Sequence, residues 1–254
     1  MNYFCLVQQK STDIFIIAHI LQNVNAYDII TDMSITLAID ASDDAKVVGQ
    51  LGSYLAKTKR AGLRTARGFI VPLDKHVGYG LSNEILREFD KLELQKVCLR
   101  ASPVTEIDET ETIKPVNRDK LLEAITYMQS NAERRWTPSA IIIQEYLDGE
   151  LCGTIHSHNP YTDAHDEIVI EARLWANNSI LGDDEEDEMI LVDKRDGAIE
   201  LESDEEELLL EADQVQELWR AVRKAEKAIG APVSLDWGFV NGVLYILRTR
   251  PLSA

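Results

Sequence analysis

The chain has 254 residues, of which 45% are hydrophobic, 26 are Lys or Arg and 44 are Asp or Glu, so its formal net charge is −18. Such a balance repels phosphodiester backbones and anionic lipid headgroups, which argues against binding to a nucleic-acid polymer or to a membrane surface. The acidity is local, because Asp183–Asp213 contains sixteen acids and two bases. The rest of the chain is close to neutral, so the net charge does not exclude a pocket for a small anion.

The cysteines and the first apolar run predict where the protein resides. Cys5, Cys98 and Cys152 are odd in number and far apart, which is typical of reduced thiols rather than of a disulfide framework or a metal site. The run Ile14–Leu21 is too short to span a bilayer, and no basic segment precedes it as in a secretory signal. We therefore expect a cytoplasmic protein.

The first predicted elements are two strands, a helix and a further strand. The β-branched runs Ile14–Leu21 and Ile29–Ile39 predict strands. Apolar residues three and four positions apart then predict a helix from about Asp43 to Arg60. Gly68–Pro72 is a short apolar run that ends at proline, which predicts a buried strand.

The next segments predict two helices that flank another strand. Ser82 precedes an amphipathic run and is expected to cap its helix. Val97–Ser102 predicts a strand that leads into an acidic loop, Pro103–Pro115. Asn117 is then expected to cap a helix that continues to about Arg134.

The second half of the chain is richer in strands. They are predicted at Ala140–Tyr146, Leu151–His158, Glu167–Ala172, Met189–Asp193 and Ala198–Leu201. The helical pattern of Ala212–Ile229 ends at Gly230, a residue suited to a left-handed C-cap. This mixture predicts an α+β fold with mostly antiparallel sheets. We divide it into an N-terminal strand extension over residues 1–40, a first lobe over 41–149 and a second lobe over 150–254, which includes the acidic segment.

The chain closes with a predicted hairpin, Val233–Phe239 and Val243–Arg248, whose turn length decides which side chains share a face. A two-residue turn at Asn241-Gly242 would place Arg248 and Arg250 beside apolar side chains. A three-residue loop, which adds the residue before this turn, would collect the charged side chains of both strands on one face. It would also leave the opposite face wholly apolar, so we favour the three-residue loop.

The shared face of this hairpin would carry one carboxylate and two guanidinium groups, from Asp236, Arg248 and Arg250. Arginine forks bind phosphate oxygens in pairs, and a neighbouring carboxylate holds Mg²⁺ on the same phosphates. The alternative is a ladder of exposed ion pairs, which contributes little to stability and binds nothing. The residues alone leave both interpretations open.

Six segments follow one another in the order of a known domain. They are Gly49–Leu55, Gly68–Pro72, Val97–Ser102, Ile143–Leu147, Gly153–Thr162 and Asp236–Pro251. In this order they resemble the GGKGANL element, the GF-V-P strand, the VxVRSS strand, the nucleotide hinge, the GVxFTxNPxTG hairpin and the closing LYILQxRP strand of the N-terminal ATP-binding domain of phosphoenolpyruvate synthase and pyruvate phosphate dikinase. The resemblance implies a two-lobed, ATP-grasp-like nucleotide-binding domain that uses ATP and Mg²⁺.

The resemblance also implies roles for individual residues. Arg100 and Arg250 would hold the triphosphate, and Glu171 would lie near the ribose. Asp236 would be a Mg²⁺ ligand in place of the family's glutamate. Backbone atoms of the hinge would bind adenine, at Gln144, Glu145 and Tyr146. Phosphoryl transfer depends mainly on positioning and charge neutralisation, which are the tasks of these residues.

Several positions depart from the family pattern. Leu51 stands where the family has a phosphate-neutralising lysine, and Arg248 replaces a glutamine metal ligand. No residue resembles the phosphate-accepting histidine, so the resemblance implies a separate partner chain with the phosphohistidine or the pyruvate-binding site. Two interpretations follow. In the first, Arg248 supplies the missing charge and the chain acts as a phosphotransferase with such partners. In the second, the chain is a degenerate pseudoenzyme that serves regulation or protein interaction.

A histidine-rich stretch suggests a metal site outside this resemblance. His156 and His158 lie on one face of a predicted strand, and the following loop, with Asp163 and Asp166, is able to return His165 toward them. Zn²⁺ suits such a set best. The alternative is that His156 packs where the family has an aromatic residue, without a metal.

Overall fold

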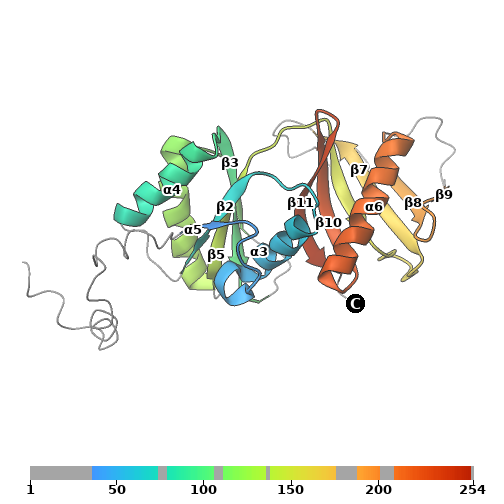
Figure 1. Ribbon diagram of the computed structural model, residues 1–254, viewed down its shortest axis with the longest axis horizontal. Coiled ribbons are helices and arrows are strands. Elements are labelled where there is room, and N and C mark those ends of the chain that lie inside the picture. Colours follow the sequence, from blue (N-terminus) through green and yellow to red (C-terminus); the bar gives the residue numbers. More distant parts are fainter. Residues whose placement is uncertain are drawn as a thin grey trace, which may run out of the picture. The chain divides into compact units, whose positions relative to one another are not determined.

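The computed structural model describes residues 36–73, 79–105, 111–135, 138–175, 188–200 and 209–252. These residues form two antiparallel sheets with helices packed on them (Figure 1). Residues 36–254 make up one unit, and contacts join the two sheets within it. The predicted strand Ile14–Leu21 lies outside the described residues.

The first sheet has the strand order β1–β2–β5–β3–β4, with every neighbouring pair antiparallel. Its strands are β1 Leu37–Ala38, β2 Gly68–Pro72, β3 Lys96–Pro103, β4 Thr112–Asn117 and β5 Pro138–Glu145. Helix α3 (Ala45–Arg60) packs on one face, where Leu51 and Leu55 meet Ile70 and Ile142. Figure 1 shows α4 (Tyr79–Lys91) and α5 (Leu121–Arg135) on the other side of the sheet.

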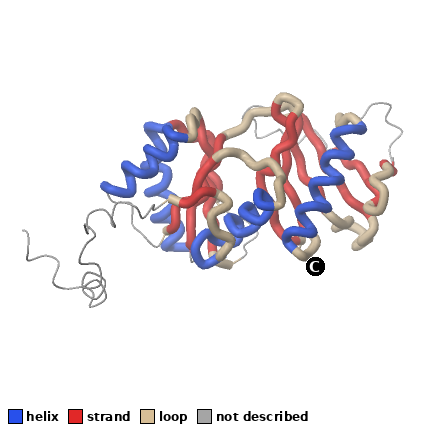
Figure 2. Tube along the Cα trace, in the orientation of Figure 1, coloured by secondary structure: helices blue, strands red, loops and turns tan. Residues whose placement is uncertain are grey.

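The second sheet has the order β11–β10–β6–β7–β8–β9, again antiparallel throughout. Its strands are β6 Leu151–His156, β7 Glu167–Leu174, β8 Glu188–Asp193, β9 Ile199–Glu200, β10 Val233–Val240 and β11 Val243–Pro251. Helix α6 (Ala212–Ile229) covers one face (Figure 2). Its Leu218 and Val222 belong to the same buried cluster as Leu235 and Trp237 of β10. As predicted, Gly230 ends α6 in the left-handed region, with φ 82°.

Two local predictions in the first sheet and its helices are wrong, and a third holds only in part. Helix α4 begins at Tyr79, so Ser82 lies inside it and is not its cap. Asn117 does stand at the N-cap position, of a short 3₁₀ helix, Arg118–Lys120, that leads directly into α5, but its side chain makes no cap hydrogen bond. The predicted loop Pro103–Pro115 contains the start of β4. This strand forms because its backbone pairs with β3, which outweighs its polar sequence.

The C-terminal hairpin differs from the favoured register. Val240 pairs with Val243, so the turn has two residues, not three, and Asn241 and Gly242 both have positive φ, as a type I′ turn requires. A bulge shifts the register between Trp237, which pairs with Ile246, and Asp236, which pairs with Arg248. Because of the bulge, the side chains in the second half of β11 alternate in the opposite sense between the two faces of the sheet. Arg248 and Arg250 therefore share a face with Asp236, as predicted. The cause is the bulge and not the length of the turn.

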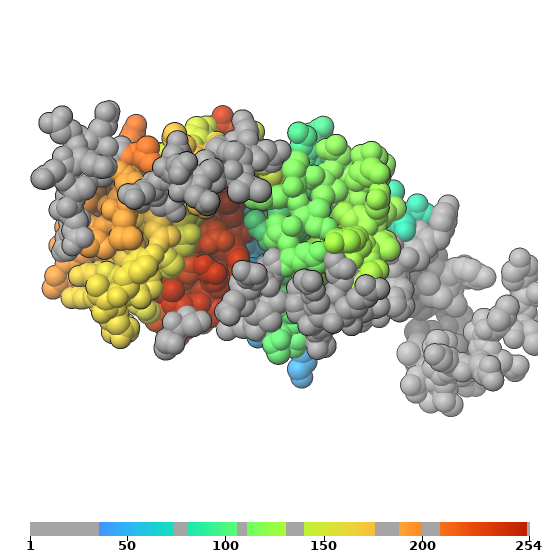
Figure 3. Space-filling model, turned by 180° about the vertical axis from the view of Figure 1, so that it is seen from behind, coloured from blue at the N-terminus to red at the C-terminus, as the bar shows by residue number. Residues whose placement is uncertain are grey.

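Strand β11 joins the second sheet to α3 and to the segment before β2. The buried hydroxyls of Thr58 and Thr249 lie 2.9 Å apart, and the Ile246 amide donates to the Arg64 carbonyl at 2.8 Å. Figure 3 views the molecule from the side opposite α6 and shows the red surface of β11 between the yellow surface of β7 and the green surface of the first sheet. The edge of the second sheet at β11 therefore lies beside the first sheet.

Two further observations concern the described part of the chain only. Cys98 is a buried free thiol. None of the helices in the described ranges combines the length and the apolarity that crossing a bilayer requires.

Candidate functional site

A row of polar residues crosses the second sheet on the face opposite α6. Asp236 of β10 pairs with Arg248 of β11 on one side and with Thr154 of β6 on the other, and Thr154 pairs with Glu171 of β7. Residues that pair directly lie on the same face of a sheet. Their chain neighbours, such as Leu235 and Trp237, point into the core beneath α6. The four polar side chains therefore share the opposite face.

A second row lies one step along the same strands. Arg250 pairs with Ser234, which pairs with His156 of β6. The Ser234 hydroxyl is buried and has no hydrogen-bond partner among the described residues. Arg250 is exposed. The two rows together place Arg250 beside Arg248 and Asp236, as the sequence predicts.

The guanidinium of Arg248 is half-buried in a positive environment. Burial lowers the pKa of Arg248, the nearby charge of Asp236 raises it, and the charges of Arg250 and Arg100 lower it further. Its Nε atom is buried without a hydrogen-bond partner in the described part of the chain. Asp236 makes no ion pair within 4.0 Å with any described residue. Three positive charges therefore converge near one carboxylate that forms no close ion pair, an arrangement that favours an anion.

The first sheet contributes Arg100 and Gln144. The Nη1 atom of Arg100 donates both to Gln144 Oε1, at 2.8 Å, and to the Leu247 carbonyl of β11, at 2.9 Å. Gln144 is only 2% exposed, and its Nε2 has no partner among the described residues. Arg100 thus connects the two sheets, and the other nitrogens of its guanidinium donate to no residue that the structure describes.

A small cavity of about 50 Å³ lies at this junction. It is lined by Ala66, Cys98, Arg100, Lys114, Gln144, Glu145, Tyr146, Leu147, Trp175 and Leu247. The Trp175 ring packs so closely on the backbone of β10 that a Cβ atom added at Gly238 would lie 2.1 Å from its Cζ3. Trp175 thus forms part of the wall of this small cavity.

The hinge segment already uses part of its hydrogen-bonding capacity. The Glu145 amide donates to the Arg67 carbonyl at 2.7 Å, and the Tyr146 amide donates to the Lys96 carbonyl at 2.8 Å. The Glu145 carboxylate forms a two-point ion pair with Arg67, at 2.6 and 2.9 Å. Adenine contacts from this segment would therefore need the other backbone atoms.

Two side chains lie against the Glu171 carboxylate, one from β6 and one from the loop between β6 and β7. The Tyr161 hydroxyl donates to its carboxylate, and His156 Nε2 lies 3.6 Å from Oε1. The proximity of His156 lowers the pKa of Glu171, burial raises it by less, and the hydrogen bond from Tyr161 lowers it further. Glu171 is therefore an ionised, oriented acceptor, which is what a ribose hydroxyl requires.

The glycine-rich segment packs against the end of β3. Gly49 has φ 70°, and an added Cβ atom would lie 2.0 Å from the Ser102 carbonyl oxygen. The Ser102 hydroxyl accepts from the Gly52 amide at 3.0 Å and donates to the Val48 carbonyl at 2.7 Å. Leu51 lies in the core below α3. The side chain at position 51 therefore faces the core, where a lysine would be costly to bury.

Lys114 is a cavity residue that the sequence analysis missed. It lies on β4 and lines the cavity together with Arg100 and Gln144. We predicted a loop for the segment that contains Lys114, so we expected no particular face of a sheet for its side chain. Recognising β4 as an edge strand would have directed attention to its one lysine.

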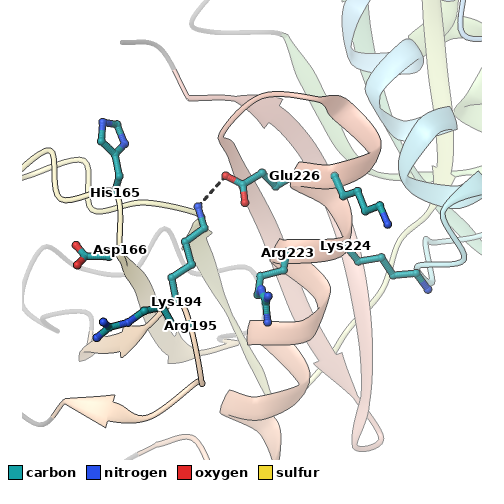
Figure 4. A pocket seen from close by; sticks show the side chains of 8 residues that line it. His165, Asp166, Lys194, Arg195, Arg223, Lys224 and Glu226 are labelled. Carbon is teal, nitrogen blue, oxygen red and sulfur yellow. Dashed lines mark hydrogen bonds and ion pairs between the residues drawn. The ribbon is translucent and has the colours of Figure 1, made fainter.

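A larger hollow, of about 680 Å³, contains none of the predicted nucleotide residues. Figure 4 shows basic side chains gathered there from α6 and from the turn after β8. Lys194 pairs with Glu226 at 2.8 Å, Arg195 pairs with Asp193, and the guanidinium of Arg223 lies 4.5 Å from the centre of the Trp219 ring. These cations already have partners.

The fold defines the class of the protein. It is an α+β, two-lobed, ATP-grasp-like fold. The solved structure of N5-carboxyaminoimidazole ribonucleotide synthetase in its ADP complex superposes with a TM-score of 0.51 at 10% identity, over 83% of this chain and 46% of that chain. At this identity the likeness concerns the fold alone.

Sequence similarity to curated proteins is local. An uncharacterized phosphotransferase, YvkC of Bacillus subtilis (strain 168), is 24% identical over 135 residues. This match spans 44% of the chain but only 16% of the relative. A probable phosphoenolpyruvate synthase of Methanocaldococcus jannaschii is 22% identical over 138 residues, 45% of the chain and 12% of the relative. No family profile matches the sequence.

Proposed function

We propose that this chain is an ATP- and Mg²⁺-binding domain of the phosphoenolpyruvate synthase type, which transfers phosphate together with separate partner chains. The observation that carries this proposal is the row from Arg248 to Glu171 beside the cavity that Arg100 lines. The fold likeness to a synthetase in complex with ADP supports it, as does the similarity to a phosphotransferase and to a probable phosphoenolpyruvate synthase.

The cationic residues fit a triphosphate. Arg100, Arg248 and Arg250 come from two sheets and influence one another electrostatically, and the buried Nε of Arg248 has no protein partner among the described residues. Phosphate oxygens would satisfy these donors. Lys114 would add the positive charge that the family places at the position of Leu51. Bound Mg²⁺ would supply further neutralisation of the phosphates during transfer.

The two carboxylates of the row fit different parts of one nucleotide. Asp236 and Glu171 lie two strands apart, which corresponds to about 10 Å. Asp236, next to the arginines, would hold Mg²⁺ on the phosphates. Glu171, oriented by His156 and Tyr161, would accept hydrogen bonds from the ribose. Adenine would then lie toward Gln144, Tyr146 and the cavity.

A second candidate function is a non-catalytic regulatory or interaction module. It is favoured by the cavity of about 50 Å³, which is too small for adenine unless Trp175 moves. The position of Arg248 opposite Asp236 in the register of the hairpin also favours the non-catalytic module. A guanidinium there repels the metal that the carboxylate would bind. In this alternative the fold persists and phosphate is not transferred.

The test is a thermal-shift titration of the full chain with ATP and ADP, each with and without Mg²⁺, followed by incubation with ATP labelled in the γ-phosphate. A ligand at a hundred times its Kd stabilises a protein by about 2.7 kcal/mol. We expect a shift with ATP that Mg²⁺ enlarges, and label transfer when a phosphohistidine-type partner domain is supplied.

The outcomes separate the two candidates. No shift at millimolar ATP would exclude both the nucleotide site and the phosphotransferase. A shift that Mg²⁺ does not alter, without release or transfer of label, would support the regulatory module. Transfer of label to a supplied partner would support the phosphotransferase.

A further inference from the structure

The loop between β6 and β7 gathers two imidazoles and a carboxylate. His158, Asp163 and His165 each offer one ligand atom, and these three atoms lie within 4.8 Å of one another. The rings of His158 and His165 meet edge to face, with their centres 5.0 Å apart and their planes at 76°. None of these residues belongs to the row of polar side chains from Arg248 to Glu171.

One nitrogen of His158 needs a partner. The side chain is only 7% exposed, and its Nδ1 atom is buried without a hydrogen bond to any described residue. A buried polar atom without a partner costs about 1–3 kcal/mol. A coordinated ion is one of the groups that accounts for such an atom in a native protein.

The loop around these residues has a defined conformation. Asn159 is 4% exposed, and its side-chain oxygen accepts from the Tyr161 and Thr162 amides at 2.9 and 3.2 Å. Its amide group donates to Glu167 at 2.8 Å. Asp163 adopts a positive φ of 61°, which turns the chain back toward the histidines. The three ligand atoms are therefore brought together by a turn that is fixed independently of them.

We propose that His158, Asp163 and His165 form a Zn²⁺ site. Two imidazoles and one carboxylate are ligands that zinc accepts, and a site with three protein ligands keeps its fourth position for water or another molecule. Tetrahedral ligands at about 2.0–2.1 Å from zinc stand roughly 3.3 Å apart, so small side-chain rotations complete the site. The ion would fasten the loop between β6 and β7.

The charges around this site are compatible with a dication. Lys194 and Glu226 both influence His158 electrostatically. They pair with each other at 2.8 Å, as the dashed line in Figure 4 shows, so the ammonium charge is largely compensated. His165 and Asp166 lie on the rim of the basic hollow in the same view.

The test is a titration of the metal-free full chain with Co²⁺, which reports tetrahedral coordination through its visible d–d bands, followed by displacement with Zn²⁺. We expect one Co²⁺ per chain, no thiolate-to-metal charge-transfer band, and complete displacement by one equivalent of Zn²⁺. Asp163→Asn and His165→Ala change exposed residues and should each weaken binding by at least about 100-fold, more than loss of an outer-shell contact does.

Asp166→Asn is the matched control, because it makes the same chemical change three residues from Asp163, at a residue outside the triad. It should bind Co²⁺ as the wild type does. Circular dichroism of each metal-free variant checks that the fold is retained. The proposal is overturned if the wild type binds no Co²⁺ or Zn²⁺ at micromolar concentration. It is also overturned if Asp163→Asn and Asp166→Asn bind equally, if a thiolate band appears, or if Fe²⁺ or Mg²⁺ displaces Zn²⁺.

Discussion

The two places where positive side chains gather differ in how far their charges are already satisfied. In the basic hollow, Lys194 and Arg195 have acidic partners, whereas Lys224 and Lys227 form no ion pair with a described residue. At the junction of the sheets, Arg248 has a buried Nε without a partner among the described residues, and Arg250 is exposed beside it. The hollow is more than ten times larger than the cavity at the junction. The buried Nε of Arg248, which has no partner among the described residues, therefore makes the junction the better candidate for an anion despite its smaller volume.

The strongest test of this comparison removes one arginine from each place. Arg250→Ala should raise the Kd for ATP about 10- to 100-fold, because a hydrogen bond to a charged group is worth about 1.5–3 kcal/mol. Arg223→Ala removes the same charge from the hollow and should leave the Kd unchanged. Isothermal titration calorimetry measures both. Equal losses in the two variants would show that only the overall charge matters.

Adding a methyl group at Gly238 tests how closely Trp175 packs on β10. Gly238→Ala places a methyl group where the Trp175 ring lies, and overpacking of this kind costs about 1–3 kcal/mol of unfolding free energy. Denaturant unfolding measures the loss. In the Trp175→Ala background the same change should cost much less, since the ring that it strikes is gone. Additive losses would mean that Trp175 does not occupy this space.

A smaller effect is expected from the carboxylate of the row. Asp236→Asn keeps the shape of the side chain but removes its charge, so Mg²⁺ should no longer strengthen ATP binding. We expect the Mg²⁺-dependent gain in affinity to fall by about tenfold, or about 1.4 kcal/mol. ATP without Mg²⁺ should bind as tightly as before, or more tightly, because a repelling charge is lost. Asp166→Asn, on the rim of the hollow, should keep the full Mg²⁺ response.

Much of the fold could be predicted from the sequence, because the signals are local. The periodicity of Ala212–Ile229 and the glycine after it give α6 with its C-cap, as observed. The apolar runs give β2, β3 and β5 of the first sheet. Element ends were less predictable. Strand β4 depends on pairing with β3, and the start of α4 at Tyr79 has no capping signal that distinguishes it from Ser82.

The candidate site was predictable only in part. The charged face of the hairpin was predicted from the wrong turn length. The bulge that produces this face is set by packing on both sides of the strand, and the alternation of polar and apolar residues does not reveal it. Lys114 was missed for the same reason that β4 was missed. The roles of Gln144, Glu145 and Tyr146, the boundary between the lobes, the partner chain and the cytoplasmic location stay predictions.

The mildest prediction concerns the paired charges of the hollow. The hydrogen bonds from Arg195 lower the pKa of Asp193 to about 2, below its ordinary 3.8. A carboxyl with a lowered pKa in the folded state stabilises the protein when it is ionised. This contribution is fully present above about pH 4 and is lost as the pH falls toward 2. Urea unfolding midpoints of the wild type should therefore decline across this window.

Asp193→Asn should flatten this part of the decline, because its side chain has no proton to take up. Arg195→Met should flatten it only in part, since the backbone amides of Arg195 and Asp196 still lower the pKa of Asp193. The two changes made together should flatten the slope no more than Asp193→Asn does alone, which is the signature of one pair. If the slope between pH 4 and pH 2 is unchanged in both single variants, Arg195 and Asp193 do not form an ion pair in solution. The cations of the hollow would then be as available to an anion as those beside Asp236.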